Sequence, residues 1–65
     1  MIIKVQKQSN ELITESEFLE IAEYQDGNGI LRESTDRGVL WMEFGTNHTQ
    51  QEINTMLDQH GLEQI

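Results

Sequence analysis

The chain contains no cysteine and no proline, and four basic residues stand against twelve acidic ones. Without cysteine no disulfide bond can stabilise the fold, and nothing in the composition indicates an oxidising compartment. The two histidines, His48 and His60, are too few for a closed structural zinc site. A domain of 65 residues buries only about 60% of the surface that its unfolded chain exposes. Because domains this small usually need an additional stabilising element, we expect this one to bind a partner or a second copy of itself.

The shortage of basic residues gives a formal net charge of −8. An acidic chain of this kind repels nucleic acid and anionic membranes, so we expect basic protein surfaces as partners, with no direct contact to nucleic acid or membrane. The apolar run Met1 to Ile3 is far too short for a signal peptide or a membrane span. These features predict a cytoplasmic protein.

Motifs of catalysis and cofactor binding are also missing. No Ser-His-Asp spacing can be built on two histidines in the last third of the chain, and residues 27–29 (GNG) lack the lysine and the further glycine of a phosphate loop. We expect His60 to be a partly buried, hydrogen-bonded residue and His48 to lie in a loop. The sequence therefore predicts a protein that is not an enzyme and has no catalytic, cofactor or metal site.

The strands are predicted from alternation of side chains. Five glycines divide the chain, which we treat as one small acidic domain over residues 1–65. Residues 1–7 alternate as a strand does. Residues 30–34 and 39–44 flank the turn residues 35–38, and this pattern predicts a β-hairpin.

The first helix is predicted from a capping box. Thr14 precedes Glu17 by three residues, so that each side chain can bind the backbone N–H of the other, and Gly27 is a candidate left-handed end. The competing interpretation is a strand over residues 18–24 that leads into a hairpin turn at residues 26–29. The capping box and the glutamate-rich composition favour the helix.

A second capping box, Thr49 with Glu52, predicts the second helix. Gly61 stands where a left-handed residue would end it, and Leu62 should then fold back onto Leu57. The apolar stripe of this helix consists of Ile53, Met56, Leu57 and His60. The predicted order is β-α-β-β-α, an α+β fold with a three-stranded sheet and two helices, and the sequence leaves the strand order open.

Residues 38–45 (GVLWMEFG) carry apolar side chains on both faces of the predicted third strand. Alternation places Leu40, Met42 and Phe44 on one face, and Val39, Trp41 and Glu43 on the other. We expect the first face to form the core with Ile3, Val5, Phe18, Ile21, Ile53, Met56 and Leu57. The second face has Ile2 and either Ile30 or Leu31 nearby, and three arrangements are compatible with it. It is covered by the second helix in a three-layer monomer, it stays exposed until another chain covers it, or it is partly exposed without a role. The enrichment of tryptophan among residues that dominate binding energy favours cover by another chain.

Six acids and no base lie in residues 11–26. Carboxylates three residues apart on a helix are separated by about 4.5 Å of rise, close to the roughly 3.4 Å between phosphates along one DNA strand. The acidic row is either a solvated helix face that keeps the chain soluble or a contact surface for a partner rich in lysine and arginine. The candidate partner-binding residues are Glu15, Glu17, Glu20, Glu23, Asp26, Val39, Trp41 and Glu43.

Short, acidic, free of cysteine and without catalytic residues, the chain resembles in size and composition small phage-encoded inhibitors such as anti-CRISPR proteins and other nucleic-acid mimics. The resemblance implies a non-enzymatic inhibitor of a basic nucleic-acid-binding protein or complex, acting in the host cytoplasm if it is encoded by a phage. One alternative is a structural or assembly module that forms a homodimer through the Trp41 face. Another is an antitoxin or immunity protein that binds one basic enzyme.

Overall fold

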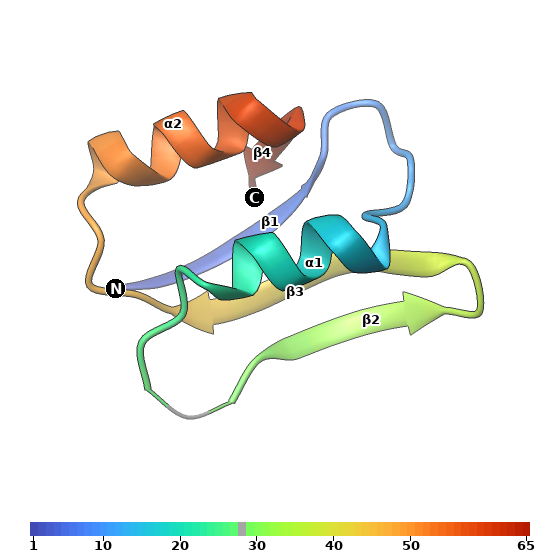
Figure 1. Cartoon of the computed structure of the whole chain (residues 1–65), viewed down its shortest axis with the longest axis horizontal. Helices are drawn as coiled ribbons and strands as arrows, with labels where there is room; N and C mark the ends of the chain where they lie inside the picture. Colours follow the sequence, from blue (N-terminus) through green and yellow to red (C-terminus); the bar gives the residue numbers. More distant parts are fainter. Residues whose placement is uncertain (28) are drawn as a thin grey trace.

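The computed structural model describes residues 1–27 and 29–65 and has an α+β architecture (Figure 1). The elements follow in the order β1 (Ile2–Lys7), α1 (Glu15–Ala22), β2 (Leu31–Thr35), β3 (Gly38–Gly45), α2 (Gln50–His60) and β4 (Leu62–Gln64). The strands form one antiparallel sheet in the order β2-β3-β1-β4. The α+β class is confirmed, but the sheet has four strands where the sequence predicted three.

The additional strand, β4, begins directly after the left-handed residue that ends α2. Gly61 has φ 63°, as predicted for the helix end, and the chain reverses there. Leu62 then lies opposite Lys7 and is buried, in the same core cluster as Leu57. Three residues are too few to show strand alternation, so β4 is defined only by its pairing with β1.

Helix α1 begins as predicted and ends earlier than predicted. Thr14 is its N-cap, and both halves of the capping box with Glu17 are formed. The helix ends at Ala22 with right-handed backbone at Glu23, so the prediction of Gly27 as the helix end and the alternative of a strand are both wrong. After Ala22 the N–H groups of residues 23–25 donate to carbonyls three residues earlier, and the Asp26 N–H then donates to the Gly45 carbonyl at the end of β3 (2.9 Å). Asn28, within the alternative turn, lies outside the described residues.

Both helices cover the same face of the sheet, which gives two layers (Figure 1). Helix α1 packs against β3, and α2 packs against β4. The predicted core residues of β1 and of both helices are buried, and the three-layer alternative is wrong. The buried hydrophobic residues are Ile3, Val5, Ile13, Phe18, Ile21, Val39, Met42, Phe44, Ile53, Met56, Leu57 and Leu62.

A β-bulge in β3 overturns the prediction for two neighbouring residues. Glu33 of β2 lies opposite Trp41 and Ser34 lies opposite Val39, so Leu40 is the extra residue of the bulge. Val39 is therefore turned into the core and is 1% exposed, whereas Leu40 is 40% exposed. The sequence placed Leu40 in the core and Val39 on the outer face, because strict alternation has no means of anticipating an inserted residue.

The backbone of Val39 is also paired with a segment outside the sheet. Ile13 forms an isolated antiparallel bridge with Val39, with N–H to O distances of 2.7 and 2.9 Å in the two directions. This close approach requires glycine at position 38, where φ is 155° and a Cβ would lie 2.7 Å from the Ile13 carbonyl oxygen. The β2–β3 turn is thereby held against the segment that leads into α1.

Candidate partner-binding surfaces

The face of the sheet opposite the helices, which we call the open face, has no second layer over it within the described residues 1–27 and 29–65 (Figure 1). Antiparallel register fixes its members, since residues directly opposite each other point to the same side. Apolar side chains on it include Ile2 and Leu31, which are 75% and 64% exposed. The residues of the open face are Ile2, Lys4 and Gln6 of β1, Leu31 and Glu33 of β2, Trp41 and Glu43 of β3, and Glu63 of β4.

Trp41 is held in place on the open face by both neighbouring strands. Its indole Nε1–H donates to Glu33 Oε2 of β2 over 2.8 Å. The Lys4 Nζ of β1 lies 4.2 Å from the centre of the ring, a cation–π contact of about 0.5–1 kcal/mol at an exposed site. The ring is half-buried by these contacts and presents a fixed aromatic surface rather than a freely rotating side chain.

A hollow of about 350 Å³ lies at the end of the open face where β1 begins and β3 ends. Ile2, Leu31, Asp26 and Glu43 are among the residues that line it. Gly45, the next residue after Glu43 on this side of β3, is also part of the lining and contributes no side chain. The structure thus brings Asp26 and Glu43, two of the predicted site residues, to one place beside exposed aliphatic groups.

Among the acids of α1, Glu17 has a structural role. One of its carboxylate oxygens accepts from the Thr14 N–H (3.0 Å), and the other lies 3.0 Å from Lys7 Nζ. Partial burial by itself raises the pKa of Glu17, but the hydrogen bonds of Thr14 and the charge of Lys7 outweigh it, so the pKa lies below its usual value. Since its carboxylate is already satisfied within the chain, Glu17 is poorly placed to bind a partner.

The other predicted acids in α1 or directly after it are exposed. Glu15 and Glu23 have no ion-pair partner among the described residues, and Glu20 Oε2 lies 3.4 Å from His60 Nε2 of α2. We name Glu15, Glu20 and Glu23 the α1 acids. They lie on the helix side of the sheet, and Trp41 and Glu43 lie on the open face, so the predicted site is divided between two opposite surfaces.

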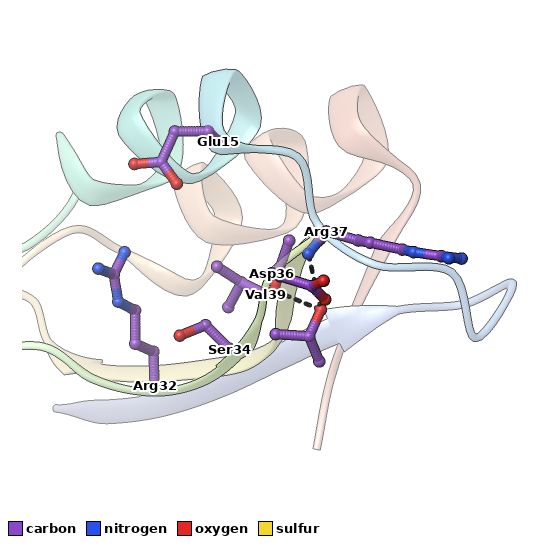
Figure 2. A pocket seen from close by; sticks show the side chains of 8 residues that line it. Glu15, Arg32, Ser34, Asp36, Arg37 and Val39 are labelled. Atoms are coloured by element: carbon purple, nitrogen blue, oxygen red, sulfur yellow. Dashed lines mark hydrogen bonds between the residues drawn. The ribbon is translucent and has the colours of Figure 1, made fainter.

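A second hollow, of about 260 Å³, lies between the start of α1 and the β2–β3 turn (Figure 2). The Arg32 guanidinium carbon lies 4.4 Å from the centre of the Phe18 ring. Arg37 extends away from the hollow in Figure 2, and the carboxylates of Glu15 and Asp36 belong to its lining. Because both signs of charge meet here, this hollow does not present a surface of one sign.

His60 is partly buried and His48 lies in a loop, as the sequence predicted, but no hydrogen bond of the His60 ring is found among the described residues. His60 has a side chain 15% exposed and contacts Glu20. His48, in the loop before α2, lies beside the Tyr24 ring (4.6 Å between centroids) and 3.4 Å from Glu52. Within residues 1–27 and 29–65, no group of three histidine, cysteine or acidic side chains is placed to hold a metal ion.

Sequence reasoning did not find the contacts that Lys4 and Glu33 make with Trp41. Alternation does place Lys4 on the side opposite Ile3 and Val5. The missing information was the strand order, because only the positions of β1 and β2 on either side of β3 bring these charges to the tryptophan.

None of the helices in the described part of the chain has the length and apolar character needed to cross a membrane. No protein-family model, curated protein or solved structure matches this chain.

Proposed function

We propose that this protein is a non-enzymatic binding protein that inhibits a basic nucleic-acid-binding protein or complex by occupying the surface meant for nucleic acid. The observation that supports the proposal is that few of the basic side chains pair with a carboxylate. Lys7 is paired with Glu17, Lys4 lies on the Trp41 ring, and Arg32 lies on the Phe18 ring. Within the described residues, Lys7–Glu17 is the one ion pair between a carboxylate and a lysine or arginine.

Twelve acids against four bases leave an excess of carboxylates, with Glu33, Glu43 and Glu63 on the open face and the α1 acids on the helix side. A net charge of −8 on a body whose Cα atoms span 30 × 24 × 19 Å gives a strong field of one sign. Such a field attracts basic surfaces over about a Debye length and raises association rates at low salt. A channel that encloses nucleic acid presents basic residues from more than one side, so the α1 acids and the open face can be contacted at the same time.

The test is inhibition of nucleic-acid binding by a panel of purified proteins, including an RNA-guided nuclease. Each is incubated with labelled nucleic acid and increasing amounts of this protein, and the remaining complex is measured by gel mobility shift. The variant to compare carries Glu15→Lys, Glu20→Lys and Glu23→Lys, because these acids are exposed and outside the capping box. Inhibition by the wild type that this variant loses supports the proposal.

A matched control separates the position of the charge from its amount. Glu11→Lys, Asp36→Lys and Asp58→Lys together change the net charge equally, at exposed sites that belong neither to α1 nor to the open face. If both triple variants lose inhibition equally, the α1 acids are not a contact surface. If the wild type inhibits no member of the panel, the proposed function is wrong for those targets.

A second candidate function, a homodimeric assembly module, is favoured by the uncovered open face. Sedimentation of the wild type beside Trp41→Ala tests it, because a dimer formed through this face would dissociate or unfold in the variant. A wild type that sediments as a monomer would remove this candidate.

A further inference from the structure

We infer that the hollow at the end of the open face binds an arginine side chain of a basic partner protein. This inference rests on the proposed function and adds to it the binding surface and the chemical group that this surface recognises. The hollow combines two features that one ligand side chain must match. Ile2 and Leu31 offer exposed aliphatic surface, and Asp26 and Glu43 supply negative charge. A long side chain with an apolar stem and a cationic end has this character.

Glu43 is available for such a cation. Lys4 lies directly opposite Glu43 in the β1–β3 register, so a cross-strand ion pair would be the ordinary arrangement. The Lys4 ammonium is instead placed over Trp41, and no ion pair joins it to Glu43 among the described residues. Asp26 uses Oδ2 to accept the Asn47 N–H (3.0 Å), which fixes its carboxylate at the edge of the hollow. Arginine suits the pair better than lysine because its planar guanidinium has five donors, enough to bind more than one acceptor.

The charges of the open face also oppose a second copy as its occupant. Within the described strands this face carries Glu33, Glu43 and Glu63 against one base, Lys4. Two copies packed through it would bring two such sets of carboxylates together, and like charges across an interface oppose association. A partner with apolar and basic groups meets no such opposition, so the charges favour a different protein over a second copy.

Two substitutions test the hollow without disturbing the core. Glu43→Gln removes its charge and keeps its shape. Gly45→Val narrows it, and the first added atom is tolerated because a Cβ at Gly45 meets only ordinary contacts, the nearest being the Asp26 carbonyl oxygen at 3.6 Å. Glu63→Gln is the matched control, with the same loss of charge on the same face but on β4.

The probe is nona-arginine, titrated into isotope-labelled protein and followed by the amide signals in a two-dimensional NMR spectrum, with nona-lysine as the comparison. The inference expects shifts at Leu31, Glu43 and Gly45 that saturate at lower concentrations of nona-arginine than of nona-lysine. Glu43→Gln should weaken this response about fivefold, the effect of one exposed ion pair of about 1 kcal/mol. Gly45→Val should abolish it with the remaining spectrum preserved, and Glu63→Gln should leave it nearly unchanged.

Three results would overturn the inference. Shifts confined to the α1 acids would place the basic peptide elsewhere and leave the proposed function standing. Equal weakening by Glu43→Gln and Glu63→Gln would show that only the total charge matters. A wild-type dimer whose interface signals include Leu31 and Trp41 would assign the open face to a second copy. Binding of arginine in the hollow without inhibition of any protein in the panel would instead overturn the proposed function alone.

Discussion

The bulge in β3 leads to a specific prediction, because it buries Val39 and exposes its larger neighbour Leu40. Truncation of Val39 should therefore lower the free energy of unfolding more than truncation of Leu40. Val39→Ala removes two buried methyl groups, worth about 1.6 kcal/mol by transfer. The cavity left in a close-packed core raises the total loss to about 2–3 kcal/mol. Leu40→Ala removes more carbon, but Leu40 is 40% exposed, so the loss is about 1–1.5 kcal/mol with no cavity. The smaller side chain should therefore contribute more to the free energy of unfolding.

The measurement is urea unfolding of wild type and both variants. Far-UV circular dichroism is the better signal, because Leu40 and Trp41 line the same small hollow and tryptophan fluorescence would respond to the local change. A domain of 65 residues has roughly 3–10 kcal/mol of total stability, so Val39→Ala removes a large part of it. In thermal unfolding each 1 kcal/mol corresponds to about 4–8 °C. If Leu40→Ala proves the more destabilising variant, the strand alternates regularly, and Val39 returns to the open face.

Three further predictions follow from single contacts. Thr49→Ala should lower the stability by about 1 kcal/mol through loss of the α2 cap, whereas Thr55→Ala, at an exposed mid-helix position, should have little effect in the same unfolding assay. Gly38→Ala should cost about 1–3 kcal/mol, because its Cβ meets the Ile13 carbonyl in a backbone conformation that side chains rarely adopt; an unchanged unfolding midpoint would contradict this. Although burial opposes it, hydrogen bonding lowers the pKa of Glu17, so its contribution is complete above about pH 4.3 and is lost as the pH falls through the lowered pKa. The stabilities of wild type and Glu17→Gln should therefore differ at neutral pH and converge in acid, and a constant difference would refute this.

Local signals in the sequence predicted the helices well, because the groups that start a helix lie within a few residues of each other. Both capping boxes form with the predicted partners, and Gly61 takes the left-handed conformation at the end of α2. The end of α1 at Ala22 was missed, and beyond it the N–H of Asp26 donates to a distant carbonyl, that of Gly45. No pattern within residues 14–27 contains that information.

The candidate surfaces were only partly predictable. Alternation identified Trp41 and Glu43 as partners on one face, and composition identified the acids of α1. Neither alternation nor composition revealed that Glu17 forms an ion pair with Lys7, that Asp26 and Glu43 line the same hollow, or that Val39 is buried. Each of these depends on contacts between segments far apart in the chain.

By itself, then, the sequence determined the class of the fold, the starts of the helices and the sign of the surface, since these follow from neighbouring residues and from composition. The tertiary structure alone decided the fourth strand, the phase of β3 and the separation of the α1 acids from the open face. The physical reason is that strand pairing is a long-range choice. A strand's register and neighbours decide which of its two faces meets the core, and one inserted residue is enough to exchange them.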